Sequence, residues 1–138
     1  MYIEPTNENG RLVFERGITG PVTMLNLLRF REVADYSDHP DLAPDEPISG
    51  REAYDRYARH TLPFLKGEGG DLQFLGAGGH CLIGPLDERW DLVMLVRHAS
   101  LEAFMGMANN QEYLAGIGHR VAALEDSRLL PIVENEQA

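Results

Sequence analysis

The sequence predicts an α+β domain with strands and helices in the order β-α-β-β-α-β. Four short apolar stretches have the length of strands, and two stretches between them carry apolar residues at helical spacing. The 138 residues fit a single domain, here 1–138, with an N-terminal extension over residues 1–20 and an acidic loop insertion over residues 32–48.

The first strand is predicted over residues 22–30, with sequence VTMLNLLRF. Neither its even nor its odd positions form a polar face, which is typical of a strand covered on both sides. A chain of this length covers one face of a sheet with its own helices. The second apolar face therefore predicts a partner subunit.

The acidic loop contains three prolines and little periodicity, which indicates a surface loop. Ser49 and Glu52 then form a capping box that begins a helix. The apolar face of this helix has Tyr54 and Tyr57 among its residues, and the glycines that follow Lys66 end it.

A second strand is predicted over residues 72–83, interrupted by a run of glycines, and a third over residues 90–98. Ser100 caps a short helix, and Asn110 caps a longer one that carries apolar residues from Tyr113 to Leu124. The last strand is predicted over residues 128–133, and a polar tail covers residues 134–138.

This element order is the split β-α-β pattern of ferredoxin-like folds. Right-handed crossovers place both helices on one face of a four-stranded antiparallel sheet. Because the opposite face is also apolar, we expect a homodimer that forms through the sheet faces.

Composition and charge narrow the classes of partner. The formal net charge is −10, which argues against nucleic acid and against an anionic membrane surface. No apolar run approaches the ~20 residues of a membrane span, and no leader segment opens the chain, so a cytoplasmic location is expected. The single cysteine, Cys81, lies among apolar residues and is expected to be buried.

Several motifs resemble one family over residues 22–133. They are Tyr54-x-x-Tyr57, Gly69-Gly70, the 90–98 strand running into Ala99-Ser100, and Glu112-Tyr113 followed seven residues later by Arg120. In this order they are similar to the domain-of-unknown-function family numbered 1330, within the dimeric α/β-barrel superfamily. The resemblance implies a ferredoxin-like fold, a dimer and a cavity on the helix-facing side of the sheet. It implies no reaction.

The candidate ligand-binding residues are Asn26, Tyr54, Tyr57, Trp90, His119 and Arg120. Asn26 is an amide in an apolar strand, so it either bonds a neighbouring loop or orients a ligand in the interior. Trp90 is either a core residue or a cavity wall. Adjacent helical residues diverge by about 100 degrees, so at most one of His119 and Arg120 faces the sheet squarely.

Arg120 is the residue that the family pattern favours, and a buried arginine needs a carboxylate or an anionic ligand. His119 is either a surface residue or an acid, base or haem ligand. The five histidines show no metal-binding spacing, and no nucleophile motif occurs, so we expect no metal and no cofactor and assign no catalytic residue.

Two functions follow from these residues. The first is a homodimer that binds a small organic ligand between sheet and helices, with a cofactor-independent monooxygenase-like enzyme as its catalytic form. The second is a non-catalytic dimeric structural or interaction protein, in which the polar groups satisfy one another. Fold analogy alone does not decide between them.

Overall fold

The computed structural model describes residues 1–134, so the expected tail beyond Glu134 lies outside the described residues. Four antiparallel strands form one sheet in the order β2-β3-β1-β4. The strands are β1 (Val22–Phe30), β2 (Asp71–Ala77), β3 (Leu92–His98) and β4 (Leu124–Ile132). This arrangement confirms the predicted ferredoxin-like α+β fold, and β1 has the predicted bounds.

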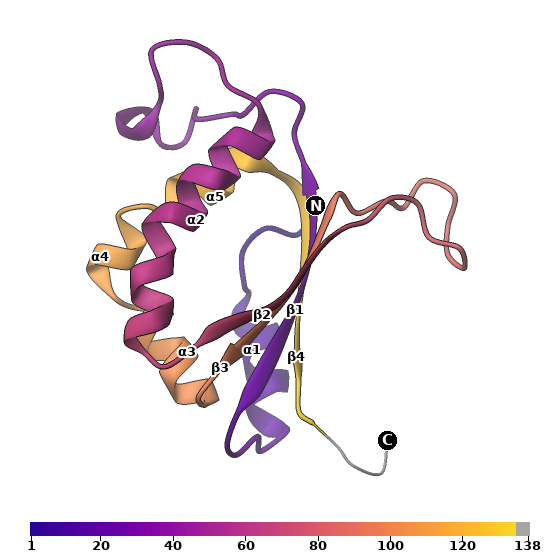
Figure 1. The fold of residues 1–138 in the computed structure, drawn as a ribbon, viewed down its shortest axis with the longest axis vertical. Coiled ribbons are helices and arrows are strands. Elements are labelled where there is room, and N and C mark those ends of the chain that lie inside the picture. The colour runs from indigo at the N-terminus through magenta and orange to yellow at the C-terminus, as the bar shows by residue number, and fades with distance from the viewer. Residues whose placement is uncertain (135–138) are drawn as a thin grey trace.

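The helices after β1 lie on one side of the sheet (Figure 1). They are α2 (Gly50–Gly67), α3 (Leu101–Ala108), α4 (Gln111–Leu114) and α5 (Ile117–Ala123), while α1 (Asn7–Glu15) precedes the sheet and η1 (Pro40–Leu42) lies in the acidic loop. The predicted caps are present: Ser49 Oγ accepts the Glu52 N–H at 3.0 Å, and the side chains of Ser100 and Asn110 cap α3 and α4. Within residues 1–134, no helix is long and apolar enough to cross a bilayer.

The helix predicted to run from Asn110 to Leu124 is broken. It ends after Leu114 and restarts at Ile117, and Gly116 lies at the break. A Cβ on Gly116 would collide with the ring of His60 on α2, so the small residue allows the two helices to approach closely. Leu124 belongs to β4, which begins earlier than predicted because Leu124 pairs with Phe30 across an irregularity in the register.

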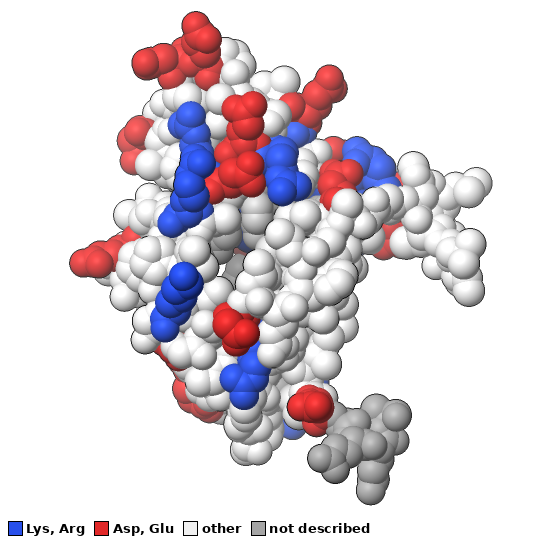
Figure 2. Space-filling view, viewed as in Figure 1, with Lys and Arg blue, Asp and Glu red and all other residues white. Residues whose placement is uncertain are grey.

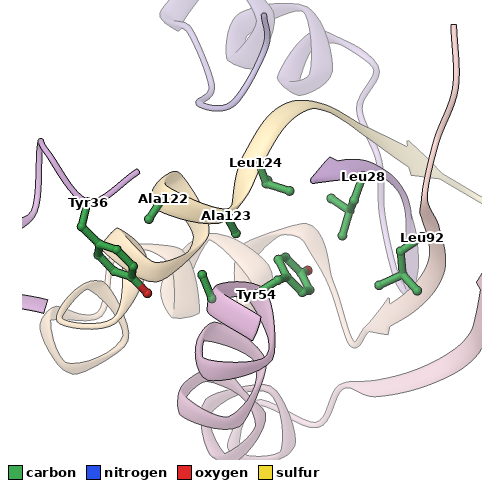
Figure 3. Packing of buried hydrophobic residues seen from close by; sticks show 8 residues of the cluster. Leu28, Tyr36, Tyr54, Leu92, Ala122, Ala123 and Leu124 are labelled. Carbon is green, nitrogen blue, oxygen red and sulfur yellow. The ribbon is translucent and has the colours of Figure 1, made fainter. Parts of the chain in front are cut away.

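The core lies between the sheet and the pair of helices α2 and α5 (Figure 3). Its fully buried members include Leu28 from β1 and Leu124 from β4, packed against Ala53 and Tyr54 of α2. Alanine side chains at the α2–α5 contact let these helices pack closely. The even positions of β1 therefore face the helices, and Asn26 shares that face.

The opposite, outer face of the sheet is also apolar. It carries the odd positions of β1 and their register partners, namely Leu25, Leu27, Val93, Leu95, Phe74, Leu130 and Ile132. Phe74 and Leu130 are each about half exposed, at 53% and 52%. β1 is thus apolar on both faces because one face packs under the helices and the other has no covering layer among the described residues.

The segment between β2 and β3 corrects two predictions. The strand expected over residues 72–83 ends at Ala77, and residues 78–89 form a projecting arm (Figure 1). The stem of the arm is held by bonds from Gly78 N–H to Asp91 O and from Trp90 N–H to Gly79 O. Cys81, expected to be buried, is exposed because the tip of the arm projects away from the rest of residues 1–134.

The N-terminal extension is tied to the β4 edge of the sheet. Tyr2 donates its N–H to Asp126 at 2.9 Å and accepts from Ser127 Oγ, and Arg120 donates to the Ile3 carbonyl. Beyond these contacts α1 exposes most of its surface. Residues 1–3 therefore cover one edge of the sheet.

Candidate functional site

Three tyrosines meet between the helix layer and the sheet. The hydroxyls of Tyr57 and Tyr113 are 2.7 Å apart, which is hydrogen-bond distance, and the ring centroids of Tyr54 and Tyr57 are 5.3 Å apart. Tyr54 and Tyr57 come from successive turns of α2, and Tyr113 comes from α4. We refer to Tyr54, Tyr57 and Tyr113 as the tyrosine cluster.

Burial lowers the acidity of two members of the tyrosine cluster, Tyr54 and Tyr113. It raises the pKa of Tyr54 well above the ordinary tyrosine value, and the neighbouring Tyr57 raises it further. The pKa of Tyr113 is also raised by burial, and its contact with Tyr57 adds to the effect. Tyrosine is already neutral at physiological pH, and the raised pKa values keep Tyr54 and Tyr113 protonated well into the alkaline range.

Arg120 is the cation of this site. Its positive charge opposes the rise in pKa of both Tyr54 and Tyr113, so the guanidinium lies within electrostatic range of these two phenols. Its one hydrogen bond in the described chain goes to the Ile3 carbonyl. Among residues 1–134, no carboxylate lies within ion-pair distance of Arg120. The side chain is half-buried, so its charge is only partly solvated.

Two further polar groups of the interior have incomplete hydrogen bonding. Thr61, one turn after Tyr57 on α2, has a buried Oγ1 without a partner among the described residues. Asn26 donates from Nδ2 to the Met24 carbonyl at 3.2 Å, and the described residues offer its carboxamide oxygen no donor. A buried polar atom without a partner costs about 1–3 kcal/mol, so the Thr61 hydroxyl marks a place where a ligand or water completes the bonding. Asn26 is half-buried, so its carboxamide oxygen is an available acceptor without that cost.

The interior is accessible from the β2 side. Leu72 and Leu75, whose register partners on β3 face the helices, are 45% and 52% exposed. The surface is hollowed between α2 and the sheet (Figure 2). Two other hollows lie outside this site. One of ≈330 Å³ lies near Thr23 and Arg97 on the outer face, and one of ≈300 Å³ lies in the acidic loop.

His119 lies apart from the tyrosine cluster. Its Nδ1 is 2.7 Å from the Tyr36 hydroxyl, and burial together with the positive charge of Arg56 lowers the pKa of this histidine. As expected for neighbours on a helix, His119 and Arg120 point to different surroundings.

Trp90 also lies apart from the tyrosine cluster. The chain bends at Asp91, which donates its N–H to the Leu28 carbonyl and accepts the Phe30 N–H, so β3 begins at Leu92 and does not include the tryptophan. The ring of Trp90 lies 5.0 Å from the guanidinium of Arg128, a residue that the register places on the outer face.

A buried pair at the other end of the helix layer has no signal in the sequence. His98 Nδ1 lies 2.8 Å from Glu68 Oε1, and the two side chains are 3% and 11% exposed. The second carboxylate oxygen of Glu68 is buried without a partner among the described residues. Within residues 1–134, no group of three or more metal-ligating side chains gathers in one place.

The raised pKa values predict how stability depends on pH in alkali. Unfolded tyrosine loses its proton near pH 10, while native Tyr54 and Tyr113 retain theirs. The unfolded chain then binds fewer protons than the native chain, so the free energy of unfolding falls as pH rises above about 10. Tyr54→Phe is expected to make this fall shallower, as measured by urea unfolding from pH 8 to pH 11. An equally steep fall in the variant would contradict the assigned shift.

The strand order, the antiparallel pairing and the helix layer on one face define a ferredoxin-like domain. In sequence and shape the chain is similar to the RPA0582 protein of unknown function from Rhodopseudomonas palustris. The two are 36% identical, with a TM-score of 0.84, over 98% of each chain. The methylated form of that protein gives 36% identity and a TM-score of 0.85 over 98% of this chain and 96% of the other. The chain belongs to the same family as this protein.

A more distant likeness shows the fold alone. SnoaB, a cofactor-independent oxygenase from Streptomyces nogalater, is 14% identical with a TM-score of 0.52, over 86% of this chain and 96% of the SnoaB chain. No family model matches the sequence, and no curated protein matches it either. The resemblance to family 1330 therefore stays a prediction.

Proposed function

We propose that this chain forms a homodimer that binds a small organic anion between α2 and the sheet. The tyrosine cluster supplies neutral phenol donors, Arg120 supplies the positive charge, and Asn26 and Thr61 supply further polar contacts. The apolar side chains Leu75 and Met94 provide the surface for a carbon skeleton.

The main support for this proposal is that Arg120 has no carboxylate partner among the described residues. A half-buried guanidinium without a carboxylate partner is costly unless an anion accompanies it. Arg120 lies within electrostatic range of Tyr54 and Tyr113, and both phenols are neutral at physiological pH, so neither supplies the missing negative charge. A planar carboxylate matches the fork of a guanidinium and accepts hydrogen bonds from phenol hydroxyls.

The apolar outer face of the sheet supports the homodimer. Leu25, Leu27 and Leu95 form its centre, and the exposed Phe74 and Leu130 extend it toward both edges. A continuous apolar sheet face of this kind is typical of a subunit interface. Packing two such faces together leaves the helix-facing interior of each subunit open from its β2 side.

The test compares anionic and neutral probes of the same shape. We expect benzoate or salicylate to bind and benzamide to bind more weakly, as measured by isothermal titration calorimetry. Arg120→Gln is expected to weaken binding of the anion by about 30-fold, because a charge-assisted hydrogen bond contributes about 2 kcal/mol. Thr61→Val is expected to weaken binding less, by about fivefold, since a neutral hydrogen bond contributes about 1 kcal/mol.

Arg59→Gln is the matched control, because Arg59 is an exposed arginine on α2. This variant is expected to bind the anion like the wild-type chain. Equal affinity of the Arg120→Gln and Arg59→Gln variants would refute the role of Arg120. Equal affinity for benzoate and benzamide would refute the anion preference.

An oxygenase is the second candidate function, and the shared fold with SnoaB is what favours it. In that case a bound phenolic anion would consume dissolved oxygen without an added cofactor. An oxygen electrode measures this directly with the ligand that calorimetry identifies. Binding without oxygen uptake would leave the chain as a binding protein.

A further inference from the structure

The tip of the arm carries three large apolar side chains that are almost fully exposed to solvent. Leu82, Ile83 and Leu86 are 101%, 94% and 95% exposed. On the face that Figure 2 shows, the far end of the arm carries no acidic or basic side chain. Single exposed apolar residues are ordinary, but three on one tip mark a contact surface.

The base of the arm is well anchored. Two backbone hydrogen bonds and a bridge between His80 and Arg89 join its two sides. Trp90, which is 5% exposed, fixes the end of the stem against Arg128. The stem therefore holds the tip away from the body of its own chain.

The direction of the arm indicates which molecule its tip contacts. The arm projects on the side of the sheet opposite the helix layer (Figure 1). The apolar outer face, with Phe74 and Leu130 half exposed, lies on the same side. Any copy of the chain that packs on this face comes within reach of the arm, and two-fold symmetry gives each copy one arm to offer the other.

We propose that the arm, residues 78–89, lies across a second copy of this chain and buries Leu82, Ile83 and Leu86 against it. The proposal rests on the proposed homodimer and adds the arm to its interface. A lipid surface is the less favoured binding partner of the tip, because the chain carries a net charge of −10, which anionic headgroups repel.

The test measures the dimer dissociation constant of the full chain by sedimentation over a dilution series. Leu86→Ser is expected to raise this constant about 100-fold, tenfold for each of the two arms, because the contact loses the burial of one leucine side chain in each arm. Leu62→Ser is the matched control, since Leu62 is an exposed leucine (44%) on α2, on the helix side of the molecule. We expect this control to leave the constant unchanged.

Cys81 provides a second readout, because it is the single cysteine of the chain and lies next to Leu82. Its reaction with a neutral maleimide is expected to be at least about tenfold slower at concentrations where the dimer forms than after dilution, because the proposed contact buries the arm tip. This readout needs no substitution, so it does not depend on how a variant folds.

The outcomes separate the two proposals. A wild-type chain that stays monomeric at all concentrations overturns both the homodimer and the arm contact. A dimer that Leu86→Ser and Leu62→Ser affect equally, with Cys81 equally reactive at all dilutions, overturns the arm contact and leaves the homodimer intact. Binding of the wild-type chain to zwitterionic vesicles that Leu86→Ser abolishes, with the dimer unchanged, assigns the tip to a lipid surface and also overturns the proposal.

Discussion

Replacement of Gly50 with alanine is expected to lower the free energy of unfolding by about 3 kcal/mol. Gly50 begins α2, and its N–H donates to the Arg31 carbonyl at 3.1 Å. A Cβ at this position would collide with that carbonyl and lie 2.7 Å from the carbonyl of Ala123. Both obstacles are backbone atoms, so the entire start of α2 must move away from the end of β1 to accommodate the methyl group.

Gly106→Ala is the control for this substitution. Gly106 lies in α3, and a Cβ there would meet nothing within 4 Å. Alanine at such a site is expected to raise the free energy of unfolding by about 0.5–1 kcal/mol through its helix propensity. Chemical unfolding measures both variants, and a Gly50→Ala variant as stable as the wild-type chain would contradict the close packing of α2 on the end of β1.

Removal of the carboxylate of Glu68 is expected to cost about 3 kcal/mol of stability in the Glu68→Ala variant. The substitution leaves His98 Nδ1 buried without its partner at 2.8 Å. The ring of His98 cannot turn freely toward water, because it also packs edge-on against Phe104 with centroids 5.0 Å apart. A buried polar nitrogen is thus left without a hydrogen bond.

A double-mutant cycle separates this pair from a general packing effect. In the His98→Phe background, Glu68→Ala removes a buried carboxylate that no longer has a partner, so its cost is expected to fall to about 1 kcal/mol or less. The coupling energy is then about 2 kcal/mol. Additive losses in the double variant would mean that the two side chains act independently.

The fold was largely predictable because periodicity and capping are local signals. The two apolar faces of residues 22–30 and the capping box at Ser49 predicted β1 and the start of α2. The arm was not predictable in this way. Its sequence, HCLIGPL, has the composition of a core segment, and only the absence of contacts with the described part of the chain shows that these side chains are exposed.

The site was predictable in part. Tyr54 and Tyr57 were expected on the apolar face of α2 and their rings do pack together there, whereas Trp90 lies elsewhere because Asp91 bends the chain. A ligand-binding role for these residues and Arg120 stays a prediction. Tyr113 was missed as a site residue, because the break between α4 and α5 separates it from Arg120 and its contact with Tyr57 joins distant segments. The partnerless Thr61 hydroxyl and the Glu68–His98 pair depend on contacts between distant segments, which no local pattern reveals.

The strand order has a consequence for the order of events during synthesis. β1 is the first strand to leave the ribosome, but its neighbours are β3 and β4, which end at His98 and Ile132. The apolar β1 therefore has no sheet partner until most of the chain has been made, and loop closure over such separations slows folding. During that interval β1 is the segment most exposed to aggregation and to capture by chaperones.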